Sequence, residues 1–457
     1  MGNTAGETRP GRSAGPGVSS DLDRVREVAV RDKEARFTAL LHHVTFERMW
    51  AAFAALREDA APGTDGVRWR EYAQDLEANL RDLHARVQSG RYRATPVRRV
   101  HIPKPDGRLR PLGIASLEDK IVQRALAEVL NAVFEVDFLG FSYGFRPGRG
   151  PHDALDALSA GFCQRKVSWV LDADIRDFFG SLDRDWLGKF LRHRVADERV
   201  LRLVGKWLAA GVIEDGKLSE SVQGAPQGAP VSPLLANVYL HHVLDLWAEW
   251  WRGHFARGDV IIVRFADDFV AGFQYQDDAE RFLAALRERF AKFSLELHPD
   301  KTRLIEFGRY AVPRRKARGD GKPETFSFLG FTHICATSRN GRFWIRRITD
   351  KKRLTAKLTQ LKGELLRRRH DPVPDQGRWL AQVITGHMNY YAVPGNGKAI
   401  RIFIREATRH WRAALSRRSQ RARITWERMR RLARRWIPKP KTMHPFPQQR
   451  FAARYSQ

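Results

Sequence analysis

The chain has 457 residues, a length that suggests two or three domains. Its 81 Lys and Arg residues outnumber its 52 Asp and Glu residues, and the formal charge of +29 indicates a polyanionic partner. With only two cysteines, the chain can form neither a disulfide scaffold nor a cysteine-rich zinc site. No apolar run is long enough to span a bilayer and no secretory signal opens the sequence, so we expect a cytoplasmic protein without a membrane partner.

The N-terminal third alternates between helical and extended patterns. Residues 1–35 contain few large apolar residues and are expected to form a flexible tail. Apolar residues at helical spacing predict helices over residues 37–56 and 72–87. Two short strands are expected between residues 97 and 114, around a Pro-Asp-Gly turn, with Lys104 and Arg110 projecting from them. Each cation alone fits a solvated hairpin, but beside a phosphoryl-transfer site they are suited as a group to bind a triphosphate.

Two loops and a helix follow. Ser116 is expected to cap a long core helix that ends near Phe134. The loop over residues 141–149 mixes aromatic residues with Arg146 and Arg149, which suits nucleic-acid contact, although a structural loop fits the spacing equally well. A Gly- and Pro-rich loop over residues 223–233 contains Gln227 and leads into an amphipathic helix over residues 234–247. Such a loop can cradle an anionic or planar ligand, with a generic turn as the alternative.

Residues 260–273 are the centre of the chain. Apolar runs lie on both sides of the pair Asp267–Asp268, which predicts a strand, a tight turn and a second strand. Another short apolar run, residues 169–175, carries Asp172 and Asp174 on one face. If these strands pair, Asp174 comes near the two carboxylates of the turn, and three carboxylates can hold two divalent ions. Mg²⁺ is the expected cofactor because it prefers carboxylate and phosphate oxygens.

The character of the sequence changes toward the C-terminus. A helix over residues 279–293, a strand beginning at 294–297, a turn at 299–302 and a strand over 326–331 are expected first. Helices over residues 351–369 and 379–391 follow, and residues 401–436 hold thirteen Arg and two Glu with interleaved aromatic residues. That composition indicates a nucleic-acid surface. The arginines expected to contact RNA are Arg146, Arg149, Arg401, Arg405, Arg412, Arg421 and Arg423.

Taken together, these motifs resemble those of a known family. Phe265-Ala-Asp-Asp268 is similar to the Tyr-x-Asp-Asp signature of reverse transcriptases, and the chain resembles the group II intron-encoded reverse transcriptase/maturases. The resemblance covers nearly everything after about residue 36, and its specificity lies in the full set of blocks in the family's order. The blocks are residues 61–66, 102–114, 142–149, 171–179, 224–233, 299–302 and 328–331, followed by 379–394, 426–436 and 444–447.

The resemblance implies an α+β fold: a right-hand polymerase with fingers and an antiparallel palm sheet, followed by an α-helical thumb or maturase domain. We expect the N-terminal extension and fingers over residues 36–160, the palm over 161–345 and the helical domain over 346–457. The implied activity is RNA-directed DNA synthesis with two Mg²⁺ ions, together with assistance to the splicing and mobility of a group II intron. The implied partners are intron RNA, an RNA template with a DNA primer, dNTPs and target DNA.

The resemblance also implies the ligands of the metal ions. Asp174, Asp267 and Asp268 match the family's metal-binding carboxylates, the last as a less direct ligand. Ile175, which follows Asp174, is placed in both the metal and the nucleotide sites.

Five further residues match positions around the incoming nucleotide. Lys104 and Arg110 would contact its triphosphate, and Gln227 would line its pocket. Phe179 would exclude a ribose 2′-hydroxyl and so select deoxynucleotides. Lys301 would protonate the leaving pyrophosphate.

The sequence departs from the family at two positions and leaves two alternatives. Phe265 replaces the common Tyr, and Ala229 stands where Gly or Ser is frequent; neither removes a metal ligand, so activity is expected. With two cysteines, no HNH endonuclease domain is expected. One alternative is an RNA-binding splicing factor with an idle polymerase site, against which the intact aspartate set argues. The other is a reverse transcriptase serving defence or CRISPR spacer acquisition, against which the maturase-like C-terminal region argues.

Overall fold

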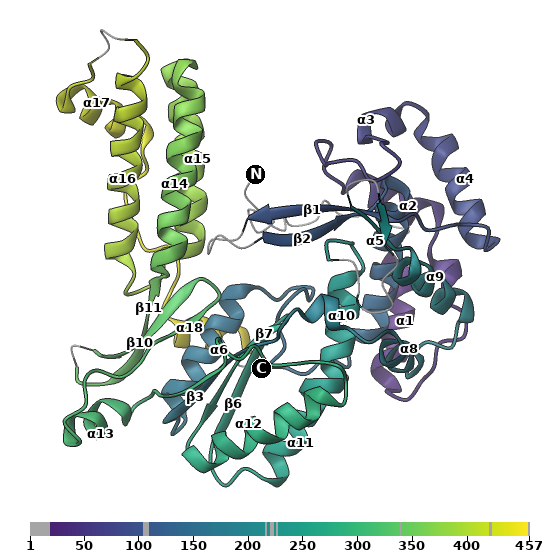
Figure 1. Cartoon of the computed structure of the whole chain (residues 1–457), viewed down its shortest axis with the longest axis horizontal. Helices are drawn as coiled ribbons and strands as arrows, with labels where there is room; N and C mark the ends of the chain where they lie inside the picture. Colours follow the sequence, from purple (N-terminus) through teal and green to yellow (C-terminus); the bar gives the residue numbers. More distant parts are fainter. Residues whose placement is uncertain are drawn as a thin grey trace.

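The computed structural model describes residues 19–103, 109–214, 217–219, 224, 227–338, 340–419 and 423–455. Figure 1 shows an N-terminal group of helices with a projecting hairpin, a central sheet, and a group of C-terminal helices that stands beside that sheet. Helices and largely antiparallel sheets are both present, so the predicted α+β class is confirmed. No helix in the described residues is long and apolar enough to cross a membrane.

The N-terminal part packs helices against the long helix α5. Ser116 caps α5 as predicted, because its Oγ accepts a hydrogen bond from the Asp119 N–H at 3.2 Å. The hairpin β1–β2 was also predicted, and it continues into a sheet of order β2-β1-β4-β5. The elements are α1 (Ser19–Arg31), α2 (Phe46–Ala54), α3 (Trp69–Tyr72), α4 (Leu76–Gln88), β1 (Val97–Pro103), β2 (Leu109–Ile114), α5 (Leu117–Phe134), α8 (Arg184–Arg192), α9 (Glu198–Ala209), β4 (Val212–Glu214) and β5 (Lys217–Ser219).

Three predictions for this part need correction. The flexible tail is wrong for α1, which buries Leu22, Val25 and Ala29 on one face. The helix expected over residues 37–56 begins only at Phe46, since Thr45 caps it. The helix expected over residues 72–87 is likewise broken, with α3 ending at Tyr72 and α4 beginning at Leu76.

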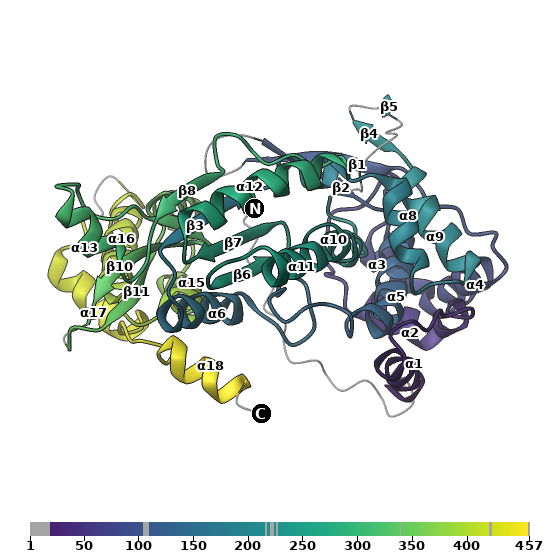
Figure 2. The same cartoon turned by 90° about the horizontal axis from the view of Figure 1, so that it is seen from below.

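The central sheet has the order β6-β7-β3-β8, with every pair antiparallel. It is buried on both faces, so its strands read as continuous apolar runs. Along β7, Phe269, Ala271 and Phe273 enter the large core with α12, whereas Val270 enters a second core with α6. Figure 2 shows α12 and α6 on either side of this sheet. The elements are α6 (Pro151–Gln164), β3 (Trp169–Asp174), α7 (Phe178–Ser181), α10 (Ser232–Leu240), α11 (Leu246–His254), β6 (Val260–Phe265), β7 (Asp268–Phe273), α12 (Gln276–Ala291) and β8 (Arg303–Glu306).

The helix predicted over residues 234–247 is in fact two α-helices. A π-helical turn at His241–Asp245 separates α10 from α11 and shifts the face that follows it. The strand predicted to begin at 294–297 is wrong, because Leu297 forms only an isolated bridge with Ile175 and the strand is β8.

The C-terminal part combines a small sheet with a helical bundle. The bundle consists of α14–α17, whose apolar faces meet around Leu380, Phe403 and Trp411. The last helix, α18, returns to pack on α6, where Arg450 forms an ion pair with Asp156 (Figure 2). The elements are α13 (Ala311–Ala317), β9 (Phe326–Phe328), β10 (Phe331–Thr337), β11 (Phe343–Thr349), α14 (Lys351–Arg367), α15 (Val373–Tyr391), α16 (Gly397–Ser416), α17 (Trp426–Trp436) and α18 (Pro447–Tyr455).

Candidate active site

Strand register brings the predicted carboxylates to one end of the central sheet. Asp174, the last residue of β3, is the direct cross-strand partner of Asp268, the first residue of β7. Because alternate residues share a face, Asp172 lies on the same side of β3 as Asp174. Asp267 precedes Asp268 in the turn. The pairing predicted between these two strands is therefore confirmed.

The turn between β6 and β7 has two residues, Ala266 and Asp267. Phe265 pairs with Asp268 across it, which makes Asp268 a strand residue rather than a turn residue. Ala266 has a φ of +58°, a left-handed conformation that such tight hairpins require and that a glycine adopts more easily. The backbone of Gly144 presses against this turn, since a Cβ at position 144 would lie 2.2 Å from the Ala266 nitrogen.

Negative charge is concentrated at this end of the sheet. Burial raises the pKa of Asp268 well above its usual range, and the three neighbouring carboxylates add to the rise. Burial also raises the pKa of Asp267; the charge of Asp174 adds to this rise, whereas Arg110 opposes it. A group of carboxylates that disfavour one another's ionisation is the electrostatic environment in which a cation binds well.

Cations from distant elements face these carboxylates. Lys301 forms an ion pair with Asp174, and Arg303 on β8 forms one with Asp172 at 3.1 Å. The positive charge of Arg353 on α14 opposes the rise in the pKa of Asp268. Lys301 was predicted to act at this site; Arg303 and Arg353 were not.

The carboxylates lie close together, but in the described residues they are not arranged as a set of metal ligands. No three Asp, Glu, His or Cys side chains within the described ranges converge as a ligand set. The Asp174 carboxylate instead accepts a hydrogen bond from the Lys301 ammonium. The donor chemistry nevertheless fits Mg²⁺, since every member of the group offers carboxylate oxygens.

The residues predicted to bind the nucleotide occupy elements around this site. Arg110 is exposed on β2, and its charge acts on Asp267. Phe179 is half-buried on the short helix α7, with its ring against Phe178. Gln227 is half-buried, and its backbone carbonyl accepts a hydrogen bond from the N–H of Gly113 at 2.7 Å, which fixes this loop to β2.

For two other members of the predicted nucleotide and metal sets, the structure describes no side chain at the site. Ile175 is buried, so only its backbone can serve a ligand. Lys104 lies outside the described residues.

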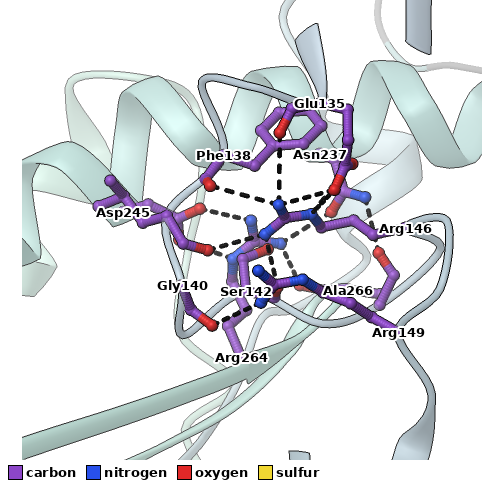
Figure 3. A network of polar contacts seen from close by, with 12 residues as sticks. Glu135, Phe138, Gly140, Ser142, Arg146, Arg149, Asn237, Asp245, Arg264 and Ala266 are labelled. Atoms are coloured by element: carbon purple, nitrogen blue, oxygen red, sulfur yellow. Dashed lines mark hydrogen bonds and ion pairs between the residues drawn. The ribbon is translucent and has the colours of Figure 1, made fainter. Parts of the chain in front are cut away.

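A network of polar contacts around the buried Arg264, here called the brace, holds the turn in place (Figure 3). Arg264, on β6, is fully buried and forms a two-point ion pair with Asp245, with Nε–Oδ1 and Nη2–Oδ2 distances of 2.7 and 2.5 Å. Its Nη1 donates to the Asn237 side chain at 3.0 Å and to the carbonyl of Ala266, inside the turn, at 2.9 Å. Burial raises the pKa of Asp245, and the contact with the guanidinium opposes that rise.

Asn237 extends the brace to the loop over residues 141–149. Its Nδ2 donates to the carbonyl of Gly144 at 2.7 Å, which holds the Gly144 backbone against Ala266. Backbone hydrogen bonds then join Arg264 to Phe141 and Tyr143 along the edge of β6. The turn is thus held from the loop, from α10 and from β6 at once.

Arg146, predicted to bind RNA, belongs to the same brace. It is buried, and its guanidinium donates to Glu135 and to the carbonyls of Leu139 and Ser142 (Figure 3). The prediction is corrected here, because this charge is used inside the fold. Arg149 is half-buried and donates to the carbonyls of Gly140 and Ser142.

The other arginines predicted to bind RNA lie on the helical bundle or beyond the described residues. Arg401, Arg405 and Arg423 are exposed, and Arg405 is paired with Glu406. Arg412 is half-buried, donates to the Ile424 carbonyl at 2.8 Å and lies over the Trp426 ring. Arg421 lies outside the described residues.

Arg264 and its partners Asn237 and Asp245 were not among the residues predicted from the sequence. One signal was available: Arg264 interrupts the apolar run Val-Ile-Ile-Val-Arg-Phe, and a charge in a buried strand must be paired. The identity of the partners was not readable, because both come from the helical segment interrupted by a π-helical turn.

Comparison with known proteins assigns the family. Residues 102–333 match the family described as reverse transcriptase (RNA-dependent DNA polymerase). The chain is 33% identical to Protein YkfC of Escherichia coli (strain K12) over 353 residues, which cover 68% of this chain and 87% of YkfC. It is 30% identical over 224 residues to the Group II intron-encoded protein LtrA of Lactococcus lactis subsp. cremoris, covering 49% of this chain and 37% of LtrA.

A plant relative is similar over a shorter stretch. Nuclear intron maturase 1, mitochondrial, of Arabidopsis thaliana is 31% identical over 87 residues, 19% of this chain and 12% of the maturase. The chain therefore spans most of YkfC but well under half of LtrA and of this maturase. By the extent of these matches, the chain belongs to the reverse transcriptase family and is related to the group II intron-encoded proteins.

Proposed function

We propose that this protein is an RNA-directed DNA polymerase of a group II intron, which extends a DNA primer on an RNA template and assists splicing and mobility of the intron. The observation that carries the proposal is the register of β3 with β7, which sets Asp174 opposite Asp268 and beside Asp267. Two-metal polymerases need such a carboxylate group for in-line phosphoryl transfer.

The proposal gives the chain a right-hand architecture. The central sheet is the palm, the N-terminal helices with β1–β2 are the fingers, and the helical bundle is the thumb or maturase domain. Figure 1 is compatible with this division, because the hairpin and the bundle lie on opposite sides of the space above the sheet. The boundaries proposed are residues 36–160, 161–345 and 346–457, with α1 added to the first part. The elements α8, α9, β4 and β5 fall in the second range by sequence but belong with the N-terminal part, since β4 pairs with β1.

Asp174, Asp267 and Asp268 would hold two Mg²⁺ ions, with the Ile175 carbonyl as a further oxygen donor. When bound, the ions would lower the pKa of the primer 3′-hydroxyl and neutralise charge on the triphosphate. The raised pKa values of Asp267 and Asp268 favour this role, because a divalent cation would offset the burial and the mutual repulsion that raise them.

The remaining chemistry is positioning and charge stabilisation. Arg110, together with Lys104, would bind the triphosphate of the incoming dNTP. Phe179 would stand against C2′ of its sugar and leave no room for a hydroxyl. Lys301, already at the site through its pair with Asp174, would give a proton to the departing pyrophosphate.

The basic bundle supports RNA binding. The outer face of α17 exposes Arg428, Arg430, Arg431, Arg434 and Arg435, while Met429 points into the bundle. Contacts from such a face go mainly to phosphates, so binding to intron RNA and to the template–primer duplex should weaken as salt rises.

The test compares primer extension with intron splicing. Wild-type protein should extend a DNA primer on an RNA template with dNTPs and Mg²⁺, and the double variant Asp267→Asn, Asp268→Asn should not. Asp59→Asn, an exposed carboxylate on the N-terminal part, is the matched control and should extend normally. A wild-type protein that promotes splicing but never extends a primer would replace the proposal with the splicing-factor alternative.

A further inference from the structure

Phe145 has a backbone conformation that its side chain does not favour. Its φ is +58°, in the left-handed region, and the residue is 55% exposed. A bulky residue in this region is a strained exception. Burial does not offset the strain, because more than half of the residue is exposed. Strain of this kind persists where the surrounding structure imposes it.

Both neighbours of Phe145 impose it. On one side, Gly144 is pressed against the Ala266 nitrogen and is held there by Asn237. On the other, the Arg146 guanidinium is bonded to Glu135 at 2.8 Å and is buried. The residues on both sides of position 145 are thus anchored to other elements of the fold.

The strained residue stands beside the catalytic turn. The centroid of the Phe145 ring lies 6.5 Å from that of Phe265, with the two planes inclined by 43°. Phe265 is the residue immediately before Ala266 and Asp267. Together the two rings form an aromatic ledge, defined here as Phe145 and Phe265, that adjoins the carboxylates.

We infer that this aromatic ledge receives the terminal base pair of the template–primer duplex, with Phe145 packing against its sugar and base edge. The inference rests on the proposed function, because a primer 3′-hydroxyl that reacts at Asp267 must bring its nucleotide to the residues beside the turn. A nucleic acid is favoured over a protein occupant by the charge of +29 and by Arg110, which faces the same turn. Aromatic side chains bind nucleotides without reading their sequence, so the contact serves any template.

The decisive variant is Phe145→Gly, because glycine removes the ring and also relieves the strain. We expect its melting temperature to be equal to or above that of the wild type. The dissociation constant for an RNA–DNA template–primer, measured by fluorescence anisotropy without dNTP, should rise about fivefold or more. In primer extension, the KM for template–primer should rise while the KM for dNTP stays unchanged.

Two further variants serve as controls. Phe145→Tyr keeps the ring and should bind template–primer like the wild type. Trp250→Ala removes an aromatic residue of similar exposure, 49%, on α11 and should leave both constants unchanged. A primer with 2-aminopurine at its 3′ end should be quenched by the wild type and less so by Phe145→Gly.

Each outcome decides the inference. Unchanged template–primer affinity in Phe145→Gly would overturn it, even where the wild type extends primers well. A large loss of thermal stability would also overturn it, because the ring would then be a packing residue. Failure of the wild type to extend any primer would instead refute the proposed function, while the anisotropy measurement still tests the ledge as a nucleic-acid contact.

Discussion

The ion pair between Arg264 and Asp245 offers the sharpest test of how the turn between β6 and β7 is held. Both side chains are fully buried, and the two hydrogen bonds that join them are charge-assisted. In Asp245→Asn the guanidinium stays charged and buried but loses its carboxylate. Breaking a buried pair in this way costs about 3–5 kcal/mol, most of it the cost of the charge left behind.

The same substitution should lower catalysis through geometry. Arg264 also donates to the Ala266 carbonyl, so a displaced guanidinium releases the turn that carries Asp267. We expect kcat of primer extension to fall at least tenfold, with little change in the KM for dNTP, because the residues proposed to bind the nucleotide lie on other elements. Urea unfolding followed by circular dichroism gives the stability, and primer extension gives the two kinetic constants.

A double variant separates stability from activity. Arg264→Met with Asp245→Leu removes both charges and keeps similar volume, a change that is often neutral for stability. It should recover most of the lost stability but not the extension rate, because no donor reaches Ala266. Glu77→Gln, which breaks the exposed pair with Arg81, should change stability by less than about 0.5 kcal/mol. Recovery of full extension in the double variant would refute the reasoning, as would a cost below about 1 kcal/mol in Asp245→Asn.

Three other predictions follow from the same structure. Burial lowers the pKa of His333 and of His387 from 6.5 to about 3. The free energy of unfolding is therefore highest above about pH 6.5, where both histidines are neutral in the folded and the unfolded protein. As pH falls toward 4, only the unfolded protein gains these protons, so the free energy of unfolding falls by roughly 1.4 kcal/mol per pH unit for each histidine. Melting temperatures between pH 7.5 and 5 should show this loss, and His333→Leu should show a shallower one; a flat profile would contradict it. Phe179→Ala should raise rNTP incorporation relative to dNTP by roughly 10–100-fold in single-nucleotide extension, and unchanged selectivity would remove Phe179 from the sugar pocket. Arg434→Gln, on the exposed face of α17, should weaken RNA binding and reduce the slope of log affinity against log salt by about 1 in titrations from 50 to 300 mM salt.

The parts of the site that could be predicted from sequence are those that depend on local pattern. The apolar runs around Asp267 and Asp174 indicated two strands, and the need to gather carboxylates predicted their pairing, which β3 and β7 confirm. The helix cap at Ser116 was also readable, because a hydroxyl before two acids is a local signal.

The parts that could not be predicted depend on contacts between distant residues. Arg146 was predicted to contact RNA because its loop mixes aromatic residues with arginines, yet the side chain is buried and donates to Glu135 and to two carbonyls. Arg264 interrupts an apolar run, which indicates a paired charge, but its partners could not be identified from the sequence. Asn237 lies on α10 and Asp245 lies in the π-helical turn that follows it. The strain at Phe145 is a backbone property imposed by packing, and no propensity reveals it.

The most direct measurement of the central claim is extension of a DNA primer on an RNA template by the wild-type protein, with dNTPs and separately with rNTPs, beside the variant Asp174→Asn. The account predicts Mg²⁺-dependent extension with dNTPs only, and a fall of roughly a thousandfold or more in the variant, because the carboxylate opposite Asp268 is lost. Folded, RNA-binding wild-type protein that extends no primer, or a variant that extends as fast as the wild type, would contradict the account.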